Sequence, residues 1–243
     1  MHHRTFQQAF VAGGALCVIL FFGAFVAAHF IPPMSPSLSA AEVAEHYRAH
    51  AGGIRLGGIL MMLSSLFYAG LVAVIGAQMR RIPTATPAAA YAQLVGGAFA
   101  CLTFFLPGLL FIVTAYRPER DPAITQALND MSWIWLVIAW PPFLVQYWAF
   151  SYAVLGDRSP APLFPRWLGY FNMWAVLCFV PATALPYFRT GPFAWNGLIV
   201  FWVPATVFTA WFIANVALLG RAVASDDTGT TQPVSARSTV VGG

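Results

Sequence analysis

The sequence contains no lysine and few charged residues of any kind. Charged residues make up 8% of the 243 positions, and the twelve basic residues are all arginine. A soluble domain carries about a quarter charged residues, so this chain has too little polar surface to cover itself in water. The absence of lysine also excludes a retinal Schiff base and a Walker-type phosphate site.

Cysteine is scarce as well. Cys17, Cys101 and Cys178 are scattered through apolar runs, which argues against a disulfide framework and against a zinc site. The net charge of +4 is small and spread between loops, so we do not expect a nucleic-acid partner. Ionisable side chains are nearly absent from the apolar runs, and His29 has no second histidine in another run, so neither an ion-coupled pump nor a haem is indicated. We expect no cofactor.

Long apolar segments dominate what is present. The hydrophobic fraction is 59% and the mean hydropathy is +0.71. A helix needs about 20 apolar residues to cross a bilayer, and the sequence offers runs at 9–31, 54–78, 88–116, 132–155, 167–188 and 193–219. These runs predict an all-α integral membrane bundle of six transmembrane helices with short interfacial helices in its outer loops.

The predicted organisation is one transmembrane domain over residues 1–220 and a disordered tail over 221–243, which is rich in Ser, Thr and Gly. Seven arginines fall on the side of the N-terminus and five on the other, and the pair Arg80-Arg81 is the most compact group. The excess favours cytoplasmic N- and C-termini, and we expect an inner (cytoplasmic) membrane.

The first outer loop contains a helix-start signal and a polar stripe. Ser39 followed by Glu42 is a capping box, and it predicts a short helix that ends at Gly52-Gly53. Glu42, His46 and His50 lie four residues apart on one face of that helix. They are either a metal-ligand set or the wet face of an interfacial helix. We favour the second interpretation because Glu42 already has a capping role.

Residues 117–133 form the densest group of charges between two apolar runs. Asp121 followed by Pro122 is a strong helix start. The helix predicted from it continues into the fourth run and places a polar set on one face: Gln126, Asn129, Asp130 and Trp133. Asp130 enters the membrane boundary there, where it either exchanges a proton or pairs with Arg117, Arg120 or Arg189.

Aromatic–proline steps interrupt two of the later runs, at Trp140-Pro141 and at Trp202-Val203-Pro204. A Phe-x-Pro sequence followed by a tyrosine and an arginine precedes each of these steps. The recurrence of this pattern reflects either a repeated helical hairpin or chance. In the first case, helices broken near mid-membrane would line a cavity.

Four segments carry a resemblance: Arg117-Pro-Glu-Arg-Asp, Gln126-Ala-Leu-Asn-Asp, Phe164-Pro-Arg-Trp and Gly191-Pro-Phe-Ala-Trp-Asn-Gly. They resemble a set of multi-pass bacterial membrane proteins, which implies a compact helical membrane protein and no particular activity. In length and aromatic content the chain is also similar, at the level of class alone, to integral-membrane terpene cyclases.

We therefore expect a bundle that accommodates a hydrophobic lipid-like or terpenoid/steroid-like molecule between its helices. The molecule would lie under a polar cap, which is formed by the outer loops. The residues expected to contact it are Arg117, Gln126, Trp133, Trp140, Arg189 and Asn196. One alternative is a lipid-phase enzyme with Asp130 as the acid/base, Asn129 orienting it, Glu119 as a second carboxylate and tryptophan faces for a developing cation. A third possibility is an accessory subunit that docks a partner through its loops.

Overall fold

The chain folds into a bundle of membrane-length helices. The computed structural model describes residues 3–225. Within that part of the chain all regular structure is helical. Six stretches are long and apolar enough to cross a membrane, namely His3–Ala27, Ala40–Met79, Pro87–Tyr116, Pro122–Gly156, Arg166–Tyr187 and Leu198–Ala224. The predicted all-α membrane bundle is confirmed.

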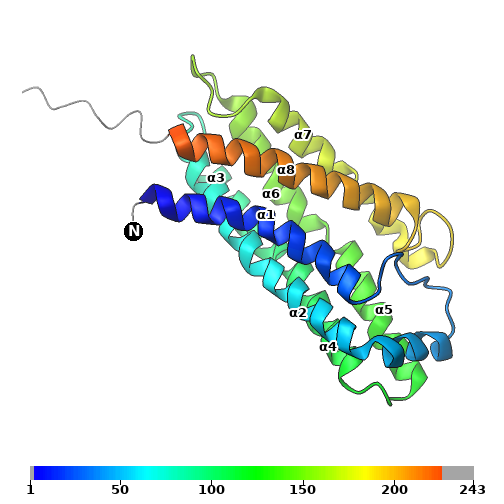
Figure 1. Ribbon diagram of the computed structural model, residues 1–243. Coiled ribbons are helices and arrows are strands. Elements are labelled where there is room, and N and C mark those ends of the chain that lie inside the picture. Colours follow the sequence, from blue (N-terminus) through cyan, green and yellow to red (C-terminus); the bar gives the residue numbers. More distant parts are fainter. Residues whose placement is uncertain (1–2, 226–243) are drawn as a thin grey trace, which may run out of the picture.

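Several of these stretches are divided into shorter elements. In chain order they are α1 (His3–Ala27), α2 (Ala40–Met79), α3 (Pro87–Ala100), α4 (Leu102–Tyr116), α5 (Pro122–Ile138), α6 (Pro141–Gly156), α7 (Arg166–Leu177), the 3-10 helix η1 (Val180–Tyr187), the π-helix η2 (Leu198–Trp202) and α8 (Val203–Ala224). Helices α1 and α8 run side by side along the near face in Figure 1, with the start of α1 and the end of α8 at the same end of the bundle.

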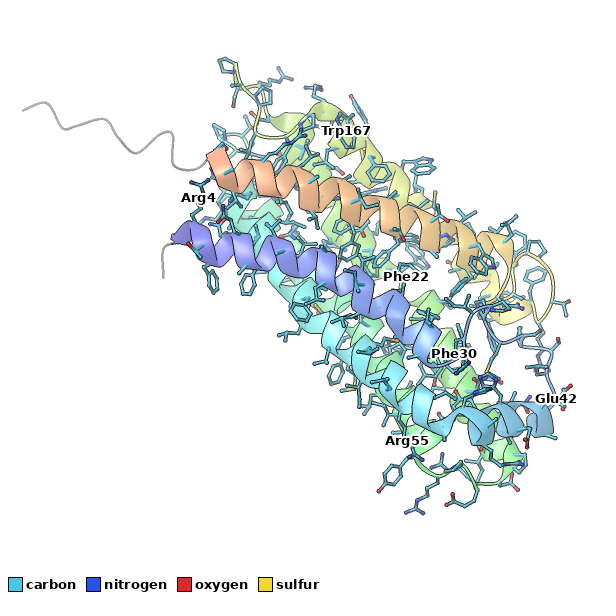
Figure 2. All side chains as sticks on the ribbon, viewed as in Figure 1. Arg4, Phe22, Phe30, Glu42, Arg55 and Trp167 are labelled. Atoms are coloured by element: carbon cyan, nitrogen blue, oxygen red, sulfur yellow. The ribbon has the colours of Figure 1, made fainter. Side chains whose placement is uncertain are left out.

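We call that end the terminal end and the opposite one the cap end. Figure 2 shows Arg4 at the terminal end and Glu42 at the cap end. Helix α8 continues through Ala224, so residues 221–224, which were predicted to belong to the tail, are helical. The remainder of that predicted tail, residues 226–243, lies outside the described residues.

The start of α2 is as predicted, but its course is not. Ser39 accepts a hydrogen bond from the Glu42 backbone, and the Glu42 carboxylate accepts one from the Ser39 backbone at 2.7 Å. The helix does not end at Gly52-Gly53; it bends at His50 (φ −118°, ψ 20°) and runs on into the second span. A Cβ on Gly53 would meet the carbonyl oxygen of Ala27, so this glycine permits close packing on α1 and does not stop the helix.

Helix α1 ends at Ala27, earlier than the predicted end of the first apolar run at residue 31. The amide of Phe30 donates to the Phe25 carbonyl at 2.9 Å, and that of His29 to the Val26 carbonyl at 3.2 Å. His29 has a positive φ of 55°. This is the hydrogen-bond pattern of a Schellman C-cap, in which one residue turns left-handed and reverses the chain.

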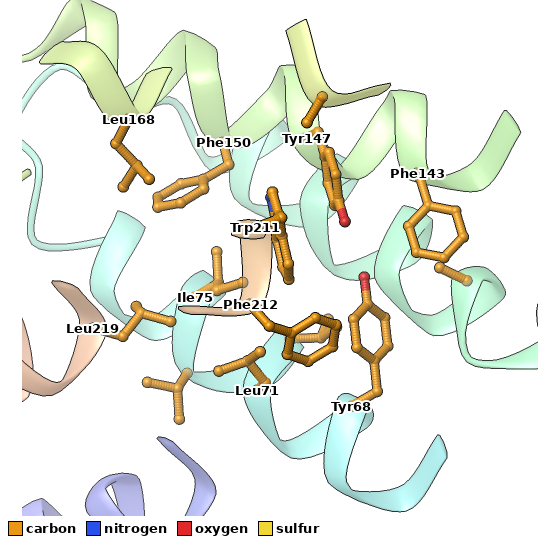
Figure 3. Packing of buried hydrophobic residues seen from close by; sticks show 14 of the residues in the cluster. Tyr68, Leu71, Ile75, Phe143, Tyr147, Phe150, Leu168, Trp211, Phe212 and Leu219 are labelled. Carbon is orange, nitrogen blue, oxygen red and sulfur yellow. The ribbon is translucent and has the colours of Figure 1, made fainter. Parts of the chain in front are cut away.

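The buried core consists of two clusters. The larger one fills the terminal half, and Figure 3 shows part of it, with Tyr147 and Trp211 face to face. Their rings are 4.5 Å apart and inclined by 3°. The Trp211 indole donates to Asn172 at 2.6 Å and the Tyr68 hydroxyl to Gln146 at 2.6 Å. Polar groups in this half therefore pair across helices α2, α6, α7 and α8.

Glycines bring α2 and α4 into close contact. A Cβ on Gly108 would lie 2.7 Å from the carbonyl oxygen of Gly58 and 3.0 Å from the backbone nitrogen of Met62. Backbone atoms cannot rotate away as a side-chain tip can, so the helices must separate to admit a methyl group.

We expect Gly108→Ala to lower the free energy of unfolding by about 1–3 kcal/mol through overpacking. Gly23→Ala is the matched control, because a Cβ there meets nothing within 4 Å; it should be neutral or slightly stabilising. Thermal unfolding of both variants in the same detergent measures the difference. Equal melting temperatures would contradict the close α2–α4 contact.

Candidate functional site

An apolar cavity of about 100 Å³ lies between the two core clusters. Its wall is built from aromatic and aliphatic side chains, with one hydroxyl among them. The lining residues are Phe21, Phe22, Phe25, Thr103, Phe104, Leu136, Val137, Ala139, Trp140, Phe143, Phe179, Ala182, Val200, Phe201, Pro204, Ala205 and Phe208.

The cavity lies where the third to sixth spans are interrupted or change helix type. The third, fourth and fifth spans are interrupted between α3 and α4, between α5 and α6, and between α7 and η1, and the sixth changes from the π-helix η2 to α8 without a gap. Residues at or next to each interruption line the cavity: Thr103, Ala139, Phe179 and Pro204. The predicted break at Trp140-Pro141 is present, whereas at Trp202-Val203-Pro204 the π-helix η2 passes directly into α8 with helical backbone angles. The cavity was predicted on the condition that the hairpin is repeated, and this repeat stays a prediction.

Side chains satisfy backbone groups near these interruptions. The Thr103 hydroxyl donates to the Ala139 carbonyl at 3.2 Å, and the Trp135 indole donates to the Leu102 carbonyl at 3.2 Å. In a bilayer no water is available for such carbonyls. These hydrogen bonds hold the broken segments beside the cavity.

Aromatic rings close the cavity toward the terminal end. Phe104, Phe143 and Phe208 form a mutually contacting group, with centroid separations of 5.8 to 6.5 Å. On another side, the lining residues Phe22 and Ala205 are only half-buried. Figure 2 shows Phe22 on α1, on the side toward α8. One side of the cavity therefore lies near the bundle surface between these two helices.

The predicted helix of the cap begins as expected. The Asp121 carboxylate accepts a hydrogen bond from the Ala123 amide at 2.8 Å, and Pro122 is the first residue of α5. Asn129 and Trp133 are buried, and Gln126 and Asp130 are half-buried. The face predicted to be polar thus points into the bundle.

Asn129 and Gln126 tie α5 to neighbouring parts of the cap. The hydroxyl of Tyr47 on α2 donates to the Asn129 side-chain oxygen at 3.1 Å. The Gln126 amide donates to the Leu38 carbonyl at 3.0 Å, and the Asn129 amide lies 3.4 Å from an Asp130 oxygen. Tyr47 was not among the predicted site residues, because a hydroxyl at the end of a buried ring is not visible in a periodicity pattern.

Other predicted site residues do not converge on Asp130. Arg117 and Glu119 are exposed in the loop between α4 and α5. Among the described residues Asp130 forms no ion pair; Arg189 is the cation whose charge acts on it. Asn196 was expected one turn inside the last helix, but it is half-buried in the turn before η2. Turns closed by the hydrogen bonds from Ala194 N–H to the Gly191 carbonyl and from Gly197 N–H to the Ala194 carbonyl occupy this segment, so the helix starts only at Leu198.

The predicted tryptophans differ in position. Trp140 lines the cavity and donates its indole N–H to Thr183 at 3.1 Å. Trp133 is 0% exposed and stacks on Trp195, with centroids 6.3 Å apart and ring planes inclined by 7°. Trp195 donates to the Met34 carbonyl at 2.7 Å, so the loop after α1 is fastened to the loop before η2.

The histidine stripe lies beside a third histidine. The rings of His46 and His50 are 4.8 Å apart, and His50 stacks on His29 at 4.2 Å. Within residues 3–225 no three His, Cys, Asp or Glu side chains are placed to hold a metal ion. The structure therefore does not support Glu42, His46 and His50 as a metal set, since the Glu42 carboxylate faces Ser39 in the cap.

The cap contacts predict different effects for two adjacent residues. Asn129→Ala should lower the free energy of unfolding by about 1–3 kcal/mol, because it leaves the buried Tyr47 hydroxyl without its acceptor. Asp130→Asn keeps that contact and should change stability by less than about 0.5 kcal/mol. Thermal unfolding of both proteins tests this. A larger loss in Asp130→Asn would make Asp130 the structural anchor of the cap.

Comparison with known proteins found no matching family model, no matching curated protein and no matching solved structure. The resemblance of the four sequence segments to multi-pass bacterial membrane proteins therefore stays an expectation.

Proposed function

We propose that this protein binds the hydrocarbon part of a lipid-like or terpenoid molecule in the cavity between its helices. The observation that carries the proposal is the apolar, aromatic-rich cavity at the depth of the helix interruptions. Ligand sites in helical proteins are commonly concave, apolar and located between helices.

The size of the cavity favours part of a larger molecule as its occupant. An engineered cavity of about 150 Å³ binds benzene, whereas this one measures about 100 Å³. It suits one isoprene unit or a few methylene groups of a chain. The half-buried lining residues Phe22 and Ala205 lie on the side between α1 and α8, where the rest of such a molecule can remain in the bilayer.

The composition of the wall also argues for binding over acid/base chemistry. No ionisable side chain lines the cavity, and Asp130, the acid/base of the enzyme alternative, is not among the lining residues. A general acid must lie within hydrogen-bond reach of the reacting atom. Asp130 and Asn129 are instead part of the cap, so we assign them no catalytic role in this proposal.

We further propose a bacterial inner membrane as the location, with both termini cytoplasmic and the cap end outside. The excess of arginine on the terminal side, with Arg80-Arg81 as its most compact group, supports this orientation.

Filling the cavity tests the proposal. Ala205→Phe places a ring in the cavity, whereas Ala210→Phe places the same ring on an exposed position of the same helix. Mass spectrometry of small molecules that co-purify with the intact protein should detect a hydrophobic compound in the wild type and in Ala210→Phe. We expect Ala205→Phe to retain at most about a tenth of it, because a ring in a cavity of this size leaves no room for a chain.

Equal retention by Ala205→Phe and the wild type would show that the compound binds elsewhere. A wild type without any bound compound, which also takes up none on incubation with lipids or isoprenoids, would favour the accessory-subunit alternative.

A further inference from the structure

Two of the residues that line the cavity carry a polar side-chain atom, and each already donates its hydrogen within the protein. The other lining side chains are hydrocarbon. The Thr103 hydroxyl donates to the Ala139 carbonyl at 3.2 Å, and the Trp140 indole donates to the Thr183 hydroxyl at 3.1 Å. A hydroxyl oxygen also has two lone pairs, so Thr103 can still accept a hydrogen bond. The side chains of the wall therefore offer an acceptor and no unused donor.

Backbone carbonyls of the wall lack their usual helical donors. Thr103 and Val137 line the cavity, and they lie four residues before Pro107 and Pro141 respectively. Proline has no N–H, so neither proline can donate the α-helical hydrogen bond to the carbonyl four residues earlier. The helix interruptions thus add acceptor groups to residues that already line the cavity.

Thr103 lies deep in the membrane. It is near the middle of the third span, Pro87–Tyr116, where no water is available to a bound molecule. A hydroxyl group that enters the cavity must donate its hydrogen to the protein or lose the hydrogen bond that it makes in water. Its acceptor has to line the cavity, and Thr103 meets this condition.

The wall restricts the chemistry of the polar group on the ligand. A ketone or ester oxygen has only lone pairs, and among the lining side chains it would find no unused donor. An ammonium group would lose its hydration without a carboxylate to compensate, because no acidic residue lines the cavity. A neutral hydroxyl supplies the hydrogen that the wall can accept.

We propose that the molecule bound in the cavity carries a neutral hydroxyl group that donates a hydrogen bond to the side-chain oxygen of Thr103. This inference rests on the proposed function and specifies its ligand class as a long-chain or isoprenoid alcohol. The hydroxyl lies beside the interruption between α5 and α6, and the remaining hydrocarbon extends between α1 and α8. Thr103 is then a specificity-determining residue, since a ligand without the hydroxyl loses this hydrogen bond.

A matched pair of probes tests this preference. The full chain in lipid nanodiscs is incubated with equal amounts of 2-tridecanol and perdeuterated 2-tridecanone, which share a carbon skeleton and are resolved by mass. Only the alcohol can donate a hydrogen bond. Native mass spectrometry measures the ratio of the two bound forms, and the partition of each probe into protein-free nanodiscs corrects this ratio for affinity toward the lipid.

We expect the wild type to favour the alcohol, and Thr103→Val to reduce the corrected alcohol-to-ketone ratio by about two- to tenfold, the range of one neutral hydrogen bond. Thr103→Ser keeps a hydroxyl and should keep the ratio. Thr206→Val is the control, because it removes a hydroxyl from an exposed position on α8 outside the lining residues. An unchanged ratio in Thr103→Val overturns the inference and leaves the proposed function intact.

The wild type covers the case in which Thr103→Val does not fold for want of its bond to the Ala139 carbonyl. A corrected ratio of one or below in the wild type overturns the inference. Ala205→Phe, which fills the cavity, should lose both probes. If Ala205→Phe binds them as well as the wild type does, or if the wild type binds neither, the proposed function itself is overturned.

Discussion

A backbone group released from a helix inside a bilayer must find its partner within the protein, and this constraint organises the middle of the bundle. The third to fifth spans are interrupted, and the sixth changes from a π-helix to an α-helix. Near the interruptions, the Thr103 hydroxyl donates to the Ala139 carbonyl and the Trp135 indole donates to the Leu102 carbonyl. Each of these contacts joins α4 to the fourth span, so it holds the segments in register. The cavity lies beside these interruptions, and residues next to them form part of its wall.

The cap and the cavity are built from different kinds of contact. The hydrogen bonds of Asn129 and Trp195 connect α5, α2 and the loops at the cap end. Polar contacts therefore hold the cap end together. The cavity below it is apolar. Trp133 belongs to both, because it stacks on Trp195 in the cap and contacts Phe25 and Phe201 of the cavity wall.

Local signals in the sequence predicted much of the cap. The capping box at Ser39 and the Asp121-Pro122 start are satisfied by atoms within a few residues, so they form as expected. Signals that depend on a neighbouring helix were misread. Gly53 looks like a helix stop, yet in the structure it admits the Ala27 carbonyl. The interruption at Cys101 carries no proline at the break itself, so it was missed.

The sequence by itself determined the solvent of this protein, the six spans and the places where helices begin, because hydrophobicity and capping act over short stretches of chain. Tertiary structure alone decided which residues meet. It placed Tyr47 against Asn129, kept Asp130 away from the cavity wall, and stacked Trp133 on Trp195. These outcomes depend on the rotation and depth of each helix against its neighbours. Side-chain packing between helices sets both quantities, and no single stretch of sequence encodes them.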